Sequence, residues 1–486
     1  MDQNNGGIIG KINTPTTTVA SGVWSLDSQF EAQSGSTWPL AFPQTTIANA
    51  CRFNRFSSDY LAFTPSGETQ RKIATFSAWV KKGLIDGGTP TIFEIYESSS
   101  NQVEIFFDSS ERLNVSNRIS NTAHNLVTNA VFRDPGAWYH IVYALDTTQG
   151  TASDRQKLYV NGTQVTSFHE AGYMNQDTNS VFGTANVNHI GRSQYSFDYF
   201  DGYITELIVI DGTALDPTSF GAFNPVTNIW EPIAYVGTYG TNGYRLDFAD
   251  SSALGNDVSG NNNDFTVNNL TSVDQSTDTC SNNFATLNPL ATNTNMGTSN
   301  LSQGNLELDR PGATSNWIGC INTMSVTQGK WYAEYKVIDA GNPQNGVMIG
   351  VTNVDLSNFQ NAGNDLSQSG EFGINYYAGG TIANNGSNIA TYTAMSDGDI
   401  VMIALDIDNG KIYWGRNGTW ENSGDPTSGS TGTGAQNLSV ITTGDTYCFH
   451  LCCREDGNVQ ANYGSPPYSI SSGNSDGNTK NLAEYG

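Results

Sequence analysis

The chain has 486 residues, 37% of them apolar, which is enough for two to four globular domains with cores of their own. Only 14% are charged, against about 25% in an average soluble protein, and Asn, Ser, Thr and 51 glycines take their place. The formal net charge of −25 argues against DNA, RNA or anionic lipid as partners, because this chain would repel such polyanions.

Targeting and redox signals are also scarce. The N-terminal stretch MDQNNGGIIGK has neither the basic start nor the apolar core of a secretory signal. No apolar run approaches the ~20 residues of a membrane-spanning helix, so we expect no membrane insertion. The six cysteines are too few and too irregularly spaced for a disulfide scaffold. Together these features predict a chain that folds in a cytoplasm with reduced thiols.

The local patterns favour strands throughout the chain. Helical periodicity is absent, and short alternating runs are separated by Asp-Gly and Asn-Gly dipeptides, which favour hairpin turns. We therefore predict an all-β protein of two tandem antiparallel β-sandwiches. In chain order we expect an attachment segment, a first sandwich, a connector with a few strands, a second sandwich and a flexible tail, at residues 1–45, 46–225, 226–300, 301–468 and 469–486.

One small device occurs in both expected sandwiches. An apolar strand, WYHIVYALD at 138–146, precedes the hairpin KLYVNGTQV at 157–165. Later, DIVMIALDID at 399–408 precedes KIYWGRNGTW at 411–420. The strand at 138–146 is apolar on both faces, so it belongs in the middle of a sandwich. Each hairpin is expected to turn at its Asn-Gly dipeptide.

The first set of strands contains five landmarks in a characteristic order. They are TFSAWVKKG at 75–83, WYHIVYALD, KLYVNGTQV, NHIGRS at 188–193 and FDGYITELIVIDGTAL at 200–215. Together they resemble a laminin-G-like, concanavalin-A-like lectin domain, and they cover nearly the whole of residues 46–225. The resemblance implies a jelly-roll sandwich.

The second set resembles a different family with the same architecture. Its landmarks are GKWYAEYKV at 329–337, MIGVTN at 348–353, FGINYYAGG at 372–380, GDIVMIALDIDNGKIYWGRNGTW at 398–420 and ANYGSPPY at 461–468. They resemble a SPRY domain, which implies a second lectin-like sandwich, concanavalin-A-like in its layers.

The N-terminal stretch GIIGKINTPTTTVASGVWSLDSQFEAQSGSTWP resembles the start of structural proteins from marine tailed phages. That resemblance implies a virion protein, folded in the host cytoplasm and displayed on the particle as a tail fibre or appendage. Its partners would be other virion proteins and a host surface glycan. We expect a homo-oligomer, with a trimer favoured, which light scattering of the full-length protein would test.

Two other functions remain open for such a chain. It could be a capsid decoration or head-fibre protein with purely structural contacts, or a bacterial cell-surface lectin or adhesin. The missing secretion signal argues against the adhesin. An enzyme is not expected, because a glycosidase of this architecture needs paired carboxylates and no Glu-x-Asp-x-x-Glu or Glu-x-Asp-x-Glu string occurs. Glu94 and Glu97 in FEIYESS do not have that spacing.

Candidate binding residues follow from chemistry alone. Aromatic rings stack on sugar C–H faces, and the candidates for this role, some of which could be core or interface residues instead, are Tyr195, Tyr199, Tyr376, Tyr377 and Trp420. We expect no cofactor. Calcium is left open, because the lectin domains that this stretch resembles often bind it through Asp, Asn and backbone oxygens. Its candidate ligands are Asp198 and Asp201 in FDYFDGY, and Asp250, Asp257 and Asp264 further along the chain.

Overall fold

The computed structural model describes most of the chain between its two ends. The described residues are 45–196, 198–225, 227–292, 300–312, 315–341, 346–353, 373–384, 387–438 and 446–469. The expected attachment segment (1–45) and flexible tail (469–486) therefore lie outside the described residues, except for Thr45 and Ser469. Within the described part of the chain, no helix has the length and apolar character needed to cross a membrane.

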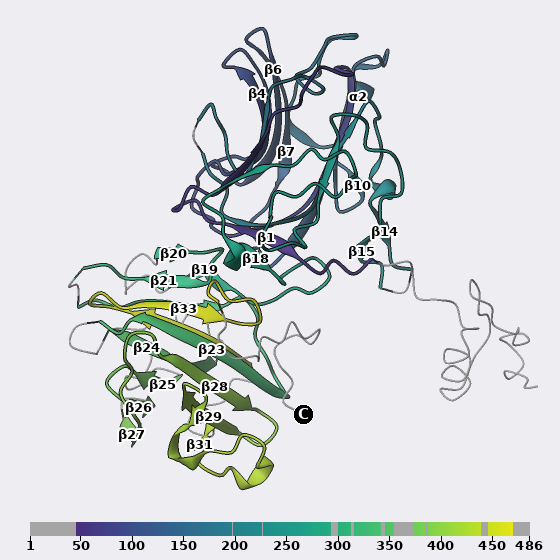
Figure 1. Ribbon diagram of the computed structural model, residues 1–486. Coiled ribbons are helices and arrows are strands. Elements are labelled where there is room, and N and C mark those ends of the chain that lie inside the picture. Colours follow the sequence, from purple (N-terminus) through teal and green to yellow (C-terminus); the bar gives the residue numbers. More distant parts are fainter. Residues whose placement is uncertain are drawn as a thin grey trace, which may run out of the picture. The chain divides into compact units, whose positions relative to one another are not determined.

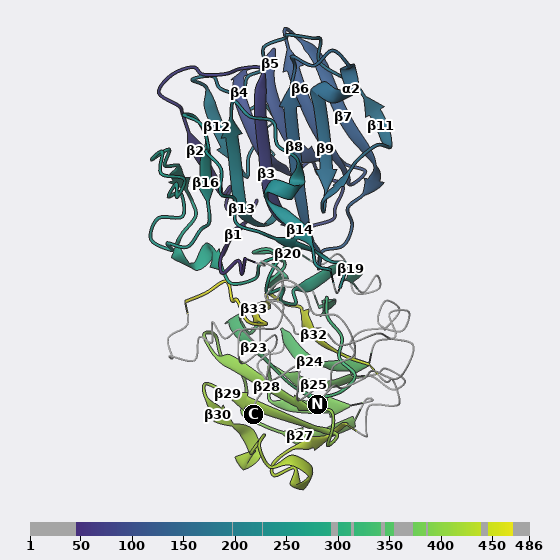
Figure 2. The ribbon, with the colours of Figure 1, turned by 90° about the vertical axis from the view of Figure 1, so that its right-hand side faces the viewer.

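The chain divides into two compact units. The smaller comprises Met1–Thr46 and Thr218–Val236, and the larger Ile47–Pro217 and Gly237–Gly486. The described part of the smaller unit is a hairpin of β14 (Gly221–Phe223) and β15 (Trp230–Pro232). Both sandwiches belong to the larger unit (Figures 1 and 2).

The first sandwich is built from two antiparallel sheets. The β3 sheet has the order β10 (Thr163–Gln164), β9 (Gln156–Val160), β8 (Trp138–Asp146), β3 (Ile73–Lys82), β13 (Gly202–Asp211), β1 (Ala50–Phe53) and β18 (Gln275–Ser276), with β16 (Tyr244–Leu246) also beside β13. The β4 sheet has the order β11 (Phe168–Ala171), β7 (Thr122–Val131), β6 (Arg112–Ile119), β5 (Asn101–Phe107), β4 (Thr91–Ser98), β12 (Val187–Ile190), β2 (Tyr60–Phe63) and β17 (Thr266–Asn268). β8 lies beside β3 near the middle of its sheet (Figure 2). Among the described residues, α2 (Ala152–Arg155) is the only α-helix, and η1 (Pro217–Ser219) and η2 (Ser272–Asp274) are short 3-10 turns.

The second sandwich repeats this construction with its own two sheets. The β24 sheet has the order β19 (Leu287–Thr292), β22 (Ile318–Asn322), β32 (Tyr447–Cys453), β24 (Val347–Asn353), β25 (Gly373–Tyr377), β26 (Thr381–Asn384) and β27 (Ser387–Thr391). The β28 sheet has the order β20 (Asn300–Ser302), β21 (Glu307–Asp309), β33 (Asn458–Asn462), β23 (Lys330–Asp339), β28 (Ile400–Asp406), β29 (Lys411–Arg416) and β30 (Thr419–Trp420), with β31 (Gln436–Asn437) also beside β29. The short 3-10 turns η3 (Glu421–Ser423) and η4 (Gly429–Thr431) follow β30.

Each sandwich closes over a separate apolar core. In the first, Phe76 of β3 packs on Phe93 of β4, with ring centroids 5.0 Å apart. In the second, Tyr376 of β25 meets Trp414 of β29 at 5.7 Å. Along each strand, every second residue points inward, and the inward residues of the two sheets form the apolar core between them. The all-β fold class, with antiparallel sandwiches, is confirmed.

Residues 226–300 contribute strands to the sheets of both sandwiches. β16 pairs with β13, β17 with β2 and β18 with β1, so this stretch completes both sheets of the first sandwich. β19 pairs with β22 in the second. All six cysteines are free thiols, as the cysteine count predicted.

The repeated hairpin device has the same hydrogen bonds in both sandwiches. Asn161 and Asn417 each have positive φ, 46° and 50°, and so does the glycine that follows each of them. These are the dihedrals that type I′ turns require and that Asn-Gly favours. The Asn161 side-chain oxygen accepts the His140 backbone N–H at 2.8 Å, and the Asn417 oxygen accepts that of Ile400 at 2.8 Å. The hairpin prediction is therefore confirmed in both copies.

Candidate functional site

The outward face of the β4 sheet carries an unusual line of polar side chains. Phe93 and Ile95 enter the core, so Glu94 between them points outward. Strand register then aligns one residue from each of β12, β4, β5, β6 and β7 in a straight row across the sheet, which we call the Glu94 row: His189, Glu94, Glu104, Ser116 and Asn125.

A loop covers the centre of this row. We call residues 192–199, which connect β12 to β13 and of which Phe197 is not described, the Tyr195 loop. The Glu94 carboxylate accepts the backbone N–H of Gln194 at 2.6 Å and the Ser193 hydroxyl at 3.0 Å. It also lies 3.2 Å from His189 Nδ1 and accepts the Tyr195 N–H at 3.4 Å. Glu94 is 0% exposed, so this carboxylate serves as the anchor of the loop.

A second carboxylate stands directly opposite the first. Glu104 of β5 is the register partner of Glu94, and its carboxyl accepts the Thr91 hydroxyl at 2.7 Å. Burial, with a smaller contribution from the Glu94 charge, raises the pKa of Glu104 to about 7. The row therefore holds one carboxylate saturated with donors and one carboxyl that changes charge near neutrality.

Next to the Glu94 row, a parallel row holds the groups suited to a ligand. It consists of Val187, Tyr96, Gln102, Arg118 and Ala123, again one from each strand. The loop crosses β4 and β5 so that the Arg118 guanidinium carbon lies 5.6 Å from the centre of the Tyr195 ring. Tyr195 itself is 46% exposed. We call Tyr195, Arg118, Gln102 and Tyr96 the Tyr195 surface.

The two predicted tyrosines of this loop lie at different places on it. Tyr199 is half-buried at the other end of the loop, where Arg192 lies over its ring at 5.7 Å and over the Tyr60 ring at 4.7 Å. Tyr60 also packs against His189 at 5.9 Å. Tyr199 is therefore part of an aromatic cluster that fastens the loop, whereas Tyr195 faces solvent.

The three candidates in the second sandwich are not brought together with these. Tyr376 is fully buried in the second core, and its hydroxyl donates to the Thr393 carbonyl. Tyr377 points to the opposite face and packs half-buried against Trp317 at 6.2 Å. Trp420 is half-buried against Tyr332 at 6.4 Å. Each of the three packs within its own sandwich, so the loop of the first sandwich offers the more accessible ring.

The two aspartates considered for calcium have separate surroundings. Asp198 accepts the Thr89 hydroxyl at 2.6 Å. Asp201 is buried beside Gly83, and burial raises its pKa to about 7. Within the described ranges, no three His, Cys, Asp or Glu side chains gather in a way that could hold a metal ion. Among the described residues, Asp198 and Asp201 therefore have no third ligand of this kind beside them that could complete a metal site.

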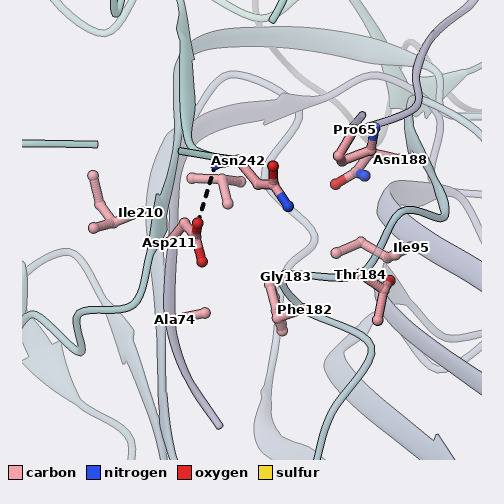
Figure 3. Close-up of a pocket in the computed structure, with 11 residues that line it drawn as sticks. Pro65, Ala74, Ile95, Phe182, Gly183, Thr184, Asn188, Ile210, Asp211 and Asn242 are labelled. Atoms are coloured by element: carbon pink, nitrogen blue, oxygen red, sulfur yellow. Dashed lines mark hydrogen bonds between the residues drawn. The ribbon is translucent and has the colours of Figure 1, made fainter. Parts of the chain in front are cut away.

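A cavity elsewhere in the first sandwich is too small for a sugar (Figure 3). It lies among Asp211, Asn242, Thr184 and Asn188, and its volume is about 10 Å³, close to the space of a single buried water. The backbone N–H of Asn242 donates to the Asp211 carboxylate at 3.0 Å beside it (Figure 3).

Sequence reasoning missed four members of this site: Arg118, Gln102, Tyr96 and Glu104. Alternation along β5 and β6 could have placed Gln102, Glu104 and Arg118 on one face. It could not have shown which strand of the sheet lies beside which, and hence that Glu104 faces Glu94.

Because the pKa of Glu104 is raised in the folded protein, we expect the stability to depend on pH. Its folded-state pKa, about 7, exceeds the ordinary value of 4.5, so the folded state holds this proton more tightly than the unfolded chain. The stabilisation is complete below about pH 4.5 and is lost as the pH rises through about 7. The groups around Glu104 are Thr91, Glu94, Ser193 and Asp198.

Glu104→Gln should remove this contribution, which is on the order of 3 kcal/mol. Urea denaturation from about pH 4.5 to about pH 8 should therefore show a shallower loss of stability in the variant. Glu97→Gln is the matched control: Glu97 lies on the neighbouring strand β4 with its side chain exposed, so this variant should follow the wild type. Identical pH profiles for wild type and Glu104→Gln would contradict the assignment.

Comparison with known proteins places the first sandwich. Residues 56–218 match the family described as Concanavalin A-like lectin/glucanases superfamily, Laminin_G_3. No curated protein matches the chain. Solved structures similar to it include the SPRY domain of human HERC1, with 15% identity over 36% of this chain and 96% of that one and a TM-score of 0.28. The heptameric SAP-like pentraxin of Limulus polyphemus has 20% identity over 36% and 76%, with a TM-score of 0.25. The PSpry domain of TRIM65 has 11% identity over 38% and 93%, with a TM-score of 0.26. Residues 56–218 of the first sandwich are thus a laminin-G-like domain of the concanavalin-A-like lectin/glucanase type.

Proposed function

We propose that the protein binds carbohydrate through the Tyr195 surface and does not hydrolyse it. The observation that carries the proposal is the exposed Tyr195 ring on a loop that is pinned to a lectin-type sheet by a buried carboxylate. A rigidly held aromatic ring loses little entropy on stacking against a sugar. Arg118, half-buried beside the ring, supplies guanidinium N–H donors for hydroxyls.

The facing carboxylates Glu94 and Glu104 raise the alternative of a glycosidase, since such enzymes use two carboxyl groups. Glu94 cannot act as a nucleophile or base in this arrangement, because both of its oxygens are engaged by the loop and the side chain is fully buried. That geometry supports a binding protein. A hydrolysis assay in which Glu94→Gln abolished measurable wild-type activity would contradict it.

We further propose that the chain is a tail-fibre or appendage subunit of a phage particle. The support is the resemblance of its N-terminal stretch to structural proteins of marine tailed phages, together with a lectin-type domain suited to host glycans. A capsid decoration protein would lie on the head of the particle, and a bacterial adhesin would lie on the cell surface. Electron microscopy of particles labelled at the C-terminus of this chain would separate a tail location from a capsid location.

Tyr195→Ala is expected to weaken glycan binding by about ten-fold per site, because an aromatic contact contributes about 1–1.5 kcal/mol beyond its area. The melting temperature should be nearly unchanged, since Tyr195 is 46% exposed. Binding to a glycan array and calorimetric melting measure the two effects. Many copies on one particle would turn weak sites into firm attachment, so single-site affinity is the quantity to compare.

The matched control is Phe56→Ala, an exposed ring with its own arginine, Arg55, at 4.9 Å but outside the Tyr195 surface. It should bind glycans as the wild type does. If Tyr195→Ala unfolds the protein, the ring is structural. If it folds and binds normally, the Tyr195 surface is not the site.

A further inference from the structure

Arg118 is a cation without a counter-charge. It is half-buried on the outward face of β6, and its Nε is buried and has no hydrogen-bond partner. Within the described ranges no carboxylate forms an ion pair with it, whereas Arg52 pairs with Asp274 and Arg245 with Glu206. Arg118 differs from other unpaired arginines such as Arg112 in lying against an exposed aromatic ring, that of Tyr195, at 5.6 Å.

Neither of the two carboxyl groups nearby in the sheet forms an ion pair with Arg118. The two Glu94 oxygens accept hydrogen bonds from Ser193 and Gln194 of the loop, and not from Arg118. Glu104 holds its proton up to about pH 7, because burial raises its pKa. Of the four residues of the Tyr195 surface, only Arg118 is charged, and its guanidinium is held beside the exposed Tyr195 ring.

An acceptor lies beside the cation. Gln102 is the register partner of Arg118, is 2% exposed, and its side-chain oxygen has no hydrogen-bond partner. A neutral amide oxygen can accept a hydroxyl but leaves the guanidinium charge uncompensated. The row therefore has a planar cation beside a neutral, buried amide, and it lacks an anion.

We propose that the Tyr195 surface selects a carboxylated sugar, a uronic or similar sugar acid, whose carboxylate pairs with Arg118 while its ring lies on Tyr195. This inference rests on the proposed carbohydrate-binding function and narrows its ligand class. The guanidinium fork matches a carboxylate with two parallel hydrogen bonds. The large net negative charge repels densely sulfated chains, so isolated carboxylates fit better than polyanions.

The test compares oligosaccharides that carry a single glucuronic acid with neutral oligosaccharides of the same linkage that carry glucose in its place, on one array with the full-length protein. Wild type should prefer the acidic series. Arg118→Gln should lose about ten- to hundred-fold in binding to that series, the effect of removing a charge-assisted pair, and keep its weak binding to the neutral one. Arg118→Lys keeps the charge without the fork and should recover part of the loss.

Arg112→Gln is the matched control. Arg112 lies on the same face of β6, is half-buried, and likewise has a buried Nε without a hydrogen-bond partner, but it does not contact Tyr195. Its replacement should leave the acidic preference intact. Equal binding of both series, with no effect of Arg118→Gln, would overturn the sugar-acid assignment and leave the carbohydrate-binding function standing. No binding of either series would overturn both.

Discussion

Asp278→Ala is expected to lower the free energy of unfolding by about 3 kcal/mol, because it leaves the buried ammonium of Lys81 without its counter-charge. The Lys81 Nζ donates to Asp278 at 2.7 Å, and the two side chains are 0% and 2% exposed. The same carboxylate accepts the Trp138 indole N–H at 3.1 Å. In the variant, Lys81 would still donate to the Asn283 side-chain oxygen, which lies 2.8 Å away. We therefore expect a loss near the lower end of the range for a broken buried ion pair.

Urea denaturation of the full chain would measure the loss. Asp154→Ala, which breaks the half-exposed pair with Lys157 at 3.1 Å, is the control and should cost no more than about 1 kcal/mol. Adding Lys81→Met to Asp278→Ala should recover part of the stability, since it removes the unpaired charge. An Asp278→Ala protein as stable as the wild type would show that water reaches Lys81 and that the pair is not a buried one.

Glu94→Ala is expected to release the Tyr195 loop, with a loss of about 3 kcal/mol in stability, because it removes the acceptor of several buried donors at once. Ser193 and His189, 0% and 4% exposed, would lose their partner, as would the backbone N–H of Gln194. Glycan binding should fall by at least about ten-fold, because the Tyr195 ring would no longer be held in place.

Hydrogen exchange of the Gln194 and Tyr195 amides gives a readout that does not depend on any ligand. Both amides donate to Glu94 and should exchange faster in the variant. Glu97→Ala, on the same strand with its side chain exposed, is the control and should leave both rates unchanged. Glu94→Gln keeps one acceptor oxygen and should give an intermediate rate. Unchanged exchange in Glu94→Ala would mean that the loop is held by its aromatic cluster instead.

The adjacent tyrosines at 376 and 377 show one structural feature that the sequence pattern could not predict, namely which of the two faces the core. Neighbouring residues of a strand point to opposite faces, so only one of the pair could enter the core. Alternation predicts that they differ but not which one faces inward, because the choice depends on which sheet packs against β25. In the structure Tyr376 meets Trp414 of the opposing sheet.

Local chemistry determined the fold class and the hairpins. The Asn161-Gly162 and Asn417-Gly418 turns could be predicted because their positive dihedrals are a property of those residues themselves. The apolar strand at 138–146 could be placed inside a sandwich for the same reason, since both of its faces are apolar. These features need no knowledge of distant segments.

Only the tertiary structure decided the site. Glu94 faces Glu104, and Tyr195 meets Arg118, through strand register and a loop that crosses two strands. The same holds for Lys81 and Asp278, and for β16 and β17, which join the first sandwich from far along the chain. Register between strands is set by the packing of the whole core, and a shift of one residue would turn every such side chain to the other face. The sequence by itself therefore determined which strands and turns form, and the packed core determined which side chains meet.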